Sequence, residues 1–354
     1  MKILVLNLGS TSTKLGVFEG LSQTHSHTIR HTRDELAQFP DILSQRDFRK
    51  QKMHEWLQSS GITPKDISVI AARGGVIRPV SGGSFHIDEE AARDAASGVW
   101  GMHPTNVGLL IAFEWSREYG IPAIFTDAPT TDELSDVARV SGLRGITRRS
   151  VFHALNAKRV ARLYCEQSGL DPLTCRLIVA HMGGGVTVCA LKGLRAIDLN
   201  SGADGEGPFA PERAGSLPSR QLLDLVKHYE SDPDRLFDTL YRHGGLMSYF
   251  GTNDVPLLME RAAKEPEVKT VLDAMVYNIA KQIAAMAVTL EGKTQQILLT
   301  GGLAHSEALM EQLTSLVSWI APCTVYPGED ELAALAYGAY RVMTGQEEAR
   351  YIGR

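Results

Sequence analysis

Residues 2–18 read KILVLNLGSTSTKLGVF, and this stretch decides the fold class. The run 2–7 is mostly apolar and rich in β-forming side chains. A turn of glycine and hydroxyl residues at 9–13 follows it, and then a second apolar run. This order predicts a β-hairpin. A similar unit recurs in mid-chain, where the strand-like residues 177–180 precede His-Met-Gly-Gly-Gly and the apolar run 186–191. The repetition predicts two related domains.

Helical patterns separate the strand-like runs. Segments 105–119, 150–168 and 268–291 have the character of long helices, and each stops at a glycine. The short apolar runs 123–126 and 296–300 lie between such helices and read as strands. Strands that alternate with helices predict an α/β protein.

Size and composition limit the class of protein. A chain of 354 residues is too long for one small core and predicts two domains, or three. Hydrophobic residues make up 44% and charged residues 22%, which is ordinary for a soluble globular protein. A net charge of -5 gives no indication of nucleic acid or an anionic membrane as a partner.

No segment approaches about 18 uncharged apolar residues, so no membrane span is expected. The N-terminal apolar run is too short for a secretory signal. The cysteines include no Cys-x-x-Cys pair and are expected to be reduced packing residues, which predicts a cytoplasmic protein. They are Cys165, Cys175, Cys189 and Cys323.

The turn within Asn7–Lys14 has the composition of a phosphate cradle. Glycine lets the backbone approach a ligand, hydroxyl groups donate hydrogen bonds, and Lys14 adds positive charge. It is not a Walker A loop, because Gly-x-x-x-x-Gly-Lys-Ser/Thr is absent. A plain hairpin turn is the alternative, here and at 181–185. Two such turns after similar strands favour phosphate binding.

Further candidates follow strands or neighbour glycines. The glycine pair 301–302 ends a strand, where α/β sheets commonly bind ligands. Asp127 also follows a strand and suits Mg²⁺, although a turn-capping role is the alternative. Arg73 and Arg213 lie beside glycines and suit carboxylate or phosphate binding, although a surface charge is the alternative for each. His153 lies near the start of an amphipathic helix, where a structural role is the alternative.

The ordered set of motifs resembles the acetate/butyrate kinase family of the actin-like ATPase superfamily. The glycine in the middle of His-x-Gly-Gly-Gly, where acetate kinases usually have Asn, and the Asp-Gly-Glu-Gly-Pro-Phe segment resemble the butyrate kinase branch. The chain is also shorter than typical acetate kinases, which again resembles the butyrate kinase branch. The segments that carry the resemblance are Asn7–Lys14, Phe125–Pro129, Arg149–Asn156, His181–Gly185, Gly205–Gly215, Thr300–Leu303 and Tyr326–Leu332.

The resemblance implies a two-domain actin-like ATPase. Each domain would have the ribonuclease H-like topology β-β-β-α-β-α-β-α, and the active site would lie in the interdomain cleft. The expected N-terminal domain spans 1–150 and is completed by a C-terminal helix within 331–354. The second, nucleotide-binding domain is expected to span 151–330.

The resemblance also assigns catalytic roles. Asp127 would serve the catalytic metal site, and His153 and Arg213 would act on the transferring phosphoryl group. The first substrate arginine of the family falls on Ile70 here, so Arg73 is interpreted as its substitute, with Arg78 as the alternative.

Two further sets of residues are implied. The metal would be approached by Asn7, Asp127 and an acid of the run 329–331; ungapped matching favours Asp330, with Glu329 as a second candidate. The nucleotide would be bound by Gly9, Ser10, Thr11, Ser12, Lys14, His181, Gly183, Gly184, Gly185, Asn253, Asp254, Gly301, Gly302 and Leu303.

The implied activity is phosphorylation of a short-chain carboxylate, butyrate or a branched relative, by direct in-line transfer from ATP with Mg²⁺. A carboxylate is already a nucleophile at neutral pH, so no general base is required. Acetate or propionate kinase activity, or a non-catalytic nucleotide sensor, are the alternatives. The expected partners are ATP, ADP, the acid, its acyl phosphate and a second copy of the chain in a homodimer or larger homo-oligomer, without nucleic acid or membrane.

Overall fold

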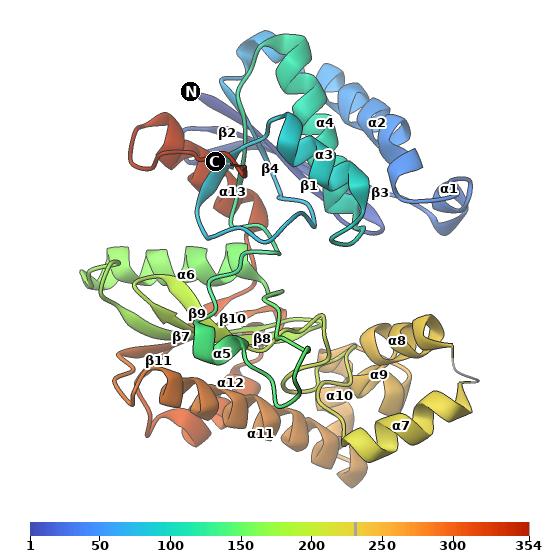
Figure 1. Ribbon diagram of the computed structural model, residues 1–354, viewed down its shortest axis with the longest axis vertical. Coiled ribbons are helices and arrows are strands. Elements are labelled where there is room, and N and C mark those ends of the chain that lie inside the picture. The colour runs from blue at the N-terminus through green and yellow to red at the C-terminus, as the bar shows by residue number, and fades with distance from the viewer. Residues whose placement is uncertain (230–231, 354) are drawn as a thin grey trace. The chain divides into compact units, whose positions relative to one another are not determined.

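The computed structural model describes residues 1–229 and 232–353 (Figure 1). The chain divides into two compact units. The first comprises Met1–Thr131 with Asp330–Arg354, and the second comprises Asp132–Glu329. Each unit is built around one β-sheet with helices packed on it.

The first unit has a six-stranded sheet in the order β3-β2-β1-β4-β6-β5. The predicted hairpin is confirmed, because β1 and β2 pair antiparallel from Lys2–Glu19 to Leu8–Thr13. Strands β1, β4 and β6 are parallel to one another, so their carboxyl ends share one edge. The strands are β1 Lys2–Leu8, β2 Ser12–Glu19, β3 Ser22–Arg30, β4 Val69–Ala72, β5 Ser84–His86 and β6 Ala123–Thr126.

Helices cover both faces of this sheet (Figure 1). Alternate β1 residues, such as Leu4 and Leu6, join a core with Val107 and Ile111 of α4. Helix α13 also packs on β1 and β4. The helical elements are α1 Arg33–Ala37, η1 Leu43–Gln45, α2 Arg46–Ser59, η2 Pro64–Asp66, α3 Glu89–Ser97, α4 Pro104–Tyr119 and α13 Glu331–Met343.

The second unit repeats the same sheet. Its strand order is β11-β10-β7-β8-β9, which matches β6-β4-β1-β2-β3 of the first unit. Again the first two strands form an antiparallel hairpin, and β10 is parallel to both β7 and β11. The predicted repeat is therefore confirmed. The strands are β7 Arg176–Met182, β8 Val186–Lys192, β9 Arg195–Leu199, β10 Gln296–Gly301 and β11 Cys323–Pro327.

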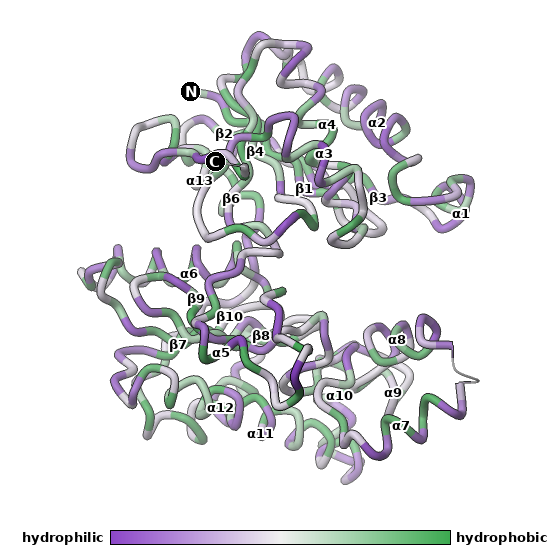
Figure 2. The backbone as a smooth tube through the Cα atoms, in the orientation of Figure 1, coloured by the Kyte–Doolittle hydropathy of each residue, from purple (hydrophilic) through white to green (hydrophobic). Residues whose placement is uncertain are grey.

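Helix α11 is long and apolar enough, by length and composition, to cross a membrane. Half of its apolar window is nevertheless buried, and Met275, Ile279 and Ile283 belong to the core of the second unit. In Figure 2 the central strands are largely green, whereas purple marks the outer helical turns. The helices of this unit are α5 Asp136–Arg139, α6 Ala154–Ser168, α7 Ser219–His228, α8 Pro233–Arg242, α9 Gly245–Phe250, α10 Val255–Ala262, α11 Pro266–Thr289, η3 Gly302–His305 and α12 Glu307–Val317.

Helices α6 and α13 each pack on the sheet of the unit to which they belong. Helix α6 follows the strands of the first unit but contacts β7 and β10, and α13 follows β11 but contacts β1 and β4. The boundary differs from the expected 150: residues 132–150 lie with the second unit, because Ser135 N donates to Ile197 O and Arg148 pairs with Asp198.

Local helix signals were accurate at the C-terminal ends. Gly120 and Gly169 end α4 and α6 with φ of 67° and 73°, a left-handed conformation that favours glycine. The helix expected at 150–168 begins later, at Ala154, because His153 is its N-cap with ψ of 58°. All four cysteines are free, as predicted.

Candidate functional site

In the first unit, three of the predicted site residues lie at one sheet edge. Asn7, Arg73 and Asp127 are at or just beyond the carboxyl ends of the parallel strands β1, β4 and β6. The strands are in register there, with Leu6 opposite Ala72. Carboxyl ends of parallel strands are where α/β sheets bind ligands.

Glu331, at the start of α13, joins this edge. Its carboxylate accepts a hydrogen bond from Asn7 Nδ2 at 2.6 Å and pairs with Arg73 Nη1 at 2.5 Å. The Glu331 side chain is only 14% exposed. Of the acids in the run 329–331, Glu331 is therefore the one beside Asn7, whereas ungapped matching favoured Asp330 as the acid that approaches the metal.

Asp330 and Glu329 lie elsewhere. Asp330 caps α13, since its Oδ1 accepts from the N–H of Ala333 at 2.9 Å. Glu329 belongs to the second unit, where its Oε2 is 3.6 Å from His181 Nε2. Because α13 begins at Glu331, the side chains of Glu329, Asp330 and Glu331 point in different directions.

Asp127 is held in an unusual backbone conformation. Its φ is 44°, which few residues other than glycine adopt, although Asp does so more readily than most. The buried carboxylate accepts from the N–H of Gly83 at 2.7 Å, and the Asp127 N–H donates to Gly83 O at 3.0 Å. Such strain clusters at functional sites and fixes where the carboxylate lies.

The turn between β1 and β2 is shaped by Arg49 of α2, a residue that sequence reasoning missed. The fully buried guanidinium donates to the carbonyl oxygens of Gly9, Ser10 and Ser12 and to Thr13 Oγ1, at 3.0 to 3.2 Å. Burial lowers its pKa to about 10, so the group remains charged at neutral pH. No local pattern in α2 distinguishes this arginine from its neighbours.

Arg78, the alternative to Arg73, is committed to two acids. Its Nε and Nη2 donate to the carboxylate of Asp94 at 2.6 and 2.8 Å, and Nη1 donates to Glu90. The hydrogen bonds with Asp94 raise the pKa of the Arg78 guanidinium. Arg73 lies at the end of β4, where its Nη1 pairs with the single carboxylate of Glu331.

In the second unit, the glycine turn 183–185 packs against Glu212 and Arg213. A Cβ built on Gly185 would lie 2.4 Å from Arg213 Cζ, and one on Gly184 would lie 2.9 Å from Glu212 Oε2. The backbone joins the two segments, because Glu212 N donates to Gly184 O. The consecutive glycines therefore permit an approach that no side chain would allow.

Two predicted histidines meet beside this turn. The rings of His153 and His181 stack with centroids 3.9 Å apart. His153 Nδ1 lies 3.0 Å from Thr187 Oγ1, and His181 Nδ1 lies 2.8 Å from Asn156 Nδ2. Helix α6 contributes His153 and β7 contributes His181, so the pair fixes the helix start against the strand end.

The third glycine turn reaches the same edge. Gly301 has φ of 92°, and a Cβ there would lie 2.4 Å from the carbonyl oxygen of Met182. Gly301 and Gly328 exchange backbone hydrogen bonds of 3.1 and 3.0 Å. The turns after β7, β10 and β11 thus lie together at the carboxyl edge of this sheet.

The remaining predicted residues divide between this edge and the surrounding structure. Asn253 Nδ2 donates to Glu212 Oε1 at 2.6 Å, which brings Asn253 to the glycine turn. Asp254 is instead the N-cap of α10, accepting from Leu257 N at 3.0 Å, and Leu303 is buried in the core. In the first unit the side chain of Lys14 is exposed.

Comparisons with known proteins show which family the chain belongs to. A model of the acetokinase family matches residues 132–318. A protein of Clostridium botulinum (strain Alaska E43 / Type E3) named probable butyrate kinase is 43% identical over 350 residues, which cover 99% of each chain.

Solved structures confirm the predicted two-domain actin-like fold. The acetate kinase of Porphyromonas gingivalis is 18% identical and superposes with a TM-score of 0.78, covering 98% of this chain and 100% of that one. A propionate kinase of Francisella tularensis subsp. tularensis SCHU S4 is 14% identical with a TM-score of 0.76, covering 95% and 98%. The resemblance found in the motifs is thus confirmed, and the chain belongs to the acetokinase family.

Proposed function

We propose that this protein is a carboxylate kinase that transfers the γ-phosphoryl group of ATP to butyrate or a close branched relative. The observation that carries the proposal is the pair of equivalent sheet edges. The first holds Asn7, Arg73 and Asp127, and the second brings the glycine turn 183–185 against Arg213 and stacks His153 on His181. The relative named probable butyrate kinase supports the choice of acid.

Each set of residues has a chemical task in this reaction. Backbone N–H groups of the turns at 9–12 and 183–185 would donate to the phosphates. The guanidinium of Arg213 would neutralise charge on the transferring group and on the carboxylate that attacks it, and Arg73 would help to orient that carboxylate. Because the carboxylate attacks as an anion, these residues position and neutralise, and none has to remove a proton.

The oxygen donors at the first edge fit a magnesium ion held partly by phosphates and water. The Asn7 and Glu331 side chains already lie 2.6 Å apart, and Asp127 is at the neighbouring strand end. In the described part of the chain, no group of three or more His, Cys, Asp or Glu is arranged to hold a metal. Mg²⁺ takes few protein ligands, and when bound it would neutralise phosphate charge.

The test is a panel of acids from C2 to C6 with ATP and Mg²⁺, with the acyl phosphate trapped by hydroxylamine. We expect butyrate or isobutyrate to give the highest kcat/KM. Acetate or propionate as the preferred acid would refute the butyrate assignment and favour the alternative kinase. Nucleotide binding without hydroxamate formation from any acid would refute the kinase itself and favour a nucleotide sensor.

A further inference from the structure

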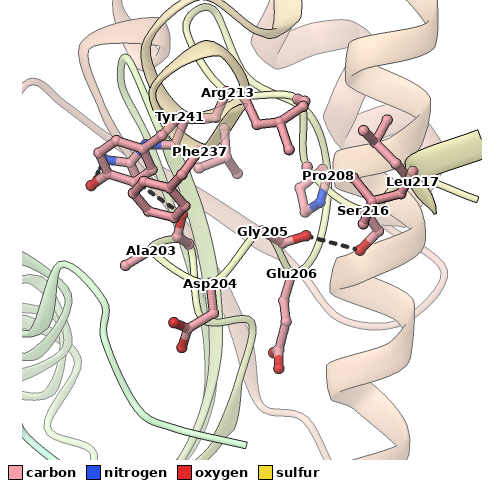
Figure 3. A pocket seen from close by; sticks show the side chains of 16 residues that line it. Ala203, Asp204, Gly205, Glu206, Pro208, Arg213, Ser216, Leu217, Phe237 and Tyr241 are labelled. Atoms are coloured by element: carbon pink, nitrogen blue, oxygen red, sulfur yellow. Dashed lines mark hydrogen bonds between the residues drawn. The ribbon is translucent and has the colours of Figure 1, made fainter. Parts of the chain in front are cut away.

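A cavity of about 240 Å³ lies within the second unit beside Arg213 (Figure 3). Its walls come from the loop 202–208, from residues 213–217 and from helices α7 and α8. In the view of Figure 3, Arg213 and Tyr241 lie together on one side, and Asp204 and Glu206 lie on the other. The motif segment 205–215 contributes much of the lining, and Arg213 is the one residue there to which the sequence assigned a catalytic role.

The walls are mainly apolar. Leu222 of α7 and Phe237 and Leu240 of α8 line the cavity, with Leu217 and Pro208 from the loops. Phe237 is 52% exposed and Leu217 is 39% exposed, so large apolar side chains remain accessible around a concave surface. Folding alone does not explain such exposure, whereas a concave apolar site with one charged group is typical of a small-molecule pocket.

The two acids of the cavity are already neutralised. Asp204 pairs with Arg149 and accepts from Ser201 Oγ at 2.7 Å. Glu206 pairs with Arg148 Nη2 at 3.0 Å and accepts from the backbone N–H of Ser201 at 3.1 Å. Their negative charges therefore do not oppose an anionic ligand at the other side of the cavity.

Arg213 supplies the charge that is left. A guanidinium has five N–H groups. Among the described residues, those of Arg213 donate to Gly202 O at 3.3 Å and Tyr241 Oη at 2.8 Å, and no carboxylate pairs with it. Its Cζ also lies 4.2 Å from the centre of the Tyr241 ring. The remaining N–H groups give the cavity a fixed cation at its wall, suited to one carboxylate.

We propose that this cavity receives the alkyl chain of the substrate, with the carboxylate directed to Arg213. The proposal rests on the proposed function and deepens it, because it makes α7 and α8 the elements that select acids of about four carbons over acetate. Each methylene buried in an apolar pocket improves binding about fourfold, so two additional carbons give roughly 15-fold. A nucleotide base is a poor occupant, because its polar edges would meet mainly apolar walls.

Helix α8 contributes residues both to the alkyl end of the cavity and to the contacts of Arg213. Phe237 and Tyr241 lie one turn apart, with parallel rings whose centres are 5.4 Å apart. Phe237 borders the alkyl chain, and Tyr241 holds the guanidinium by both its hydroxyl and its ring. Tyr241 is therefore a positioning residue for Arg213, and the same helix contacts both ends of the substrate.

The test compares two neighbouring leucines of α7. Leu222→Trp fills the cavity, whereas Leu223, which is 61% exposed and does not line the cavity, gives the matched control Leu223→Trp. The acid panel is measured on wild type and both variants. We expect Leu222→Trp to lower the ratio of kcat/KM for butyrate to that for acetate about tenfold or more, and Leu223→Trp to leave the ratio unchanged.

A second variant acts in the opposite direction and keeps the test decisive if Leu222→Trp fails to fold. Phe237→Ala enlarges the cavity and should raise the ratio of hexanoate to butyrate severalfold. Unchanged ratios in both cavity variants, or a loss of equal size for acetate and butyrate, would overturn the pocket while leaving the kinase intact. Absence of hydroxamate from wild type with every acid would instead overturn the proposed function itself.

Discussion

Replacement of Arg49 by lysine tests whether the Arg49 guanidinium shapes the turn between β1 and β2. Lysine keeps the positive charge but has no planar fork, so it cannot reach the carbonyl oxygens of Gly9, Ser10 and Ser12 together. We expect Arg49→Lys to destabilise the first unit and to raise the KM for ATP more than it lowers kcat.

The magnitude follows from the contacts. Arg49 makes four hydrogen bonds to the turn and one to Gln45 Oε1, all from a charged donor. Such bonds contribute about 1.5–3 kcal/mol each, but water can reach part of the turn and the variant also loses the cost of burying a guanidinium. A net loss of about 2–4 kcal/mol is therefore expected, which is a large share of the stability of a domain.

The assay combines urea unfolding, followed by far-UV circular dichroism, with steady-state kinetics at saturating acid. Arg46→Lys is the matched control, because Arg46 lies one turn earlier on α2 and its side chain is 43% exposed. The control should change stability by less than about 1 kcal/mol, as exposed ion pairs do. A KM for ATP within twofold of wild type in a stably folded Arg49→Lys would refute the idea that the guanidinium shapes the turn.

Three other outcomes follow from single contacts. Gly185→Ala should abolish most turnover, because its Cβ would displace the guanidinium 2.4 Å away, whereas Gly142→Ala, where a Cβ meets nothing within 4 Å, should be neutral; kinetics of the folded variants decide. Lys158→Met should lower the free energy of unfolding by about 3–5 kcal/mol, because it removes a buried cation whose Nζ lies 2.7 Å from the buried Glu133 carboxylate. Urea titration measures this loss. Burial raises the pKa of Cys165 from 9.0 to about 12, so the folded protein favours the protonated thiol. The contribution of this thiol to stability is present below pH 9 and is lost as the pH rises toward 12. Unfolding curves measured between pH 8 and 11 should therefore show a free energy of unfolding that falls with pH.

The sequence predicted those features that local patterns specify. The hairpin at 2–18, the strand Ala123–Thr126 and the helix ends at Gly120 and Gly169 depend on residues within a few positions of one another. The repeat of turn chemistry at 181–185 predicted the second sheet for the same reason. Such signals are strong because the spacing of apolar side chains and the left-handed conformation of glycine are determined by residues within about one turn of each other.

Contacts between segments that are distant in the sequence could not be predicted from local patterns. Arg49 reaches Gly9 across 40 residues, and Asn7 reaches Glu331 across 324. Neither pair has a local signature, because any arginine of α2 or any acid of the run 329–331 fits the same pattern. The packing of α13 on the first sheet selects Glu331, since it presents that side chain to the ends of β1 and β4.

The acids of the run 329–331 contact residues of two different units. The chain passes there from the second unit to the first, and the acids on either side of Asp330 join different groups: Glu329 lies near His181, and Glu331 contacts Arg73 and Asn7. The Asp330 carboxylate instead caps the helix that follows, a contribution of about 1 kcal/mol. The cap fixes where α13 begins, and the start of α13 determines which acid reaches Asn7. Asp330, the residue that ungapped matching favoured, thus helps to place Glu331 beside Asn7.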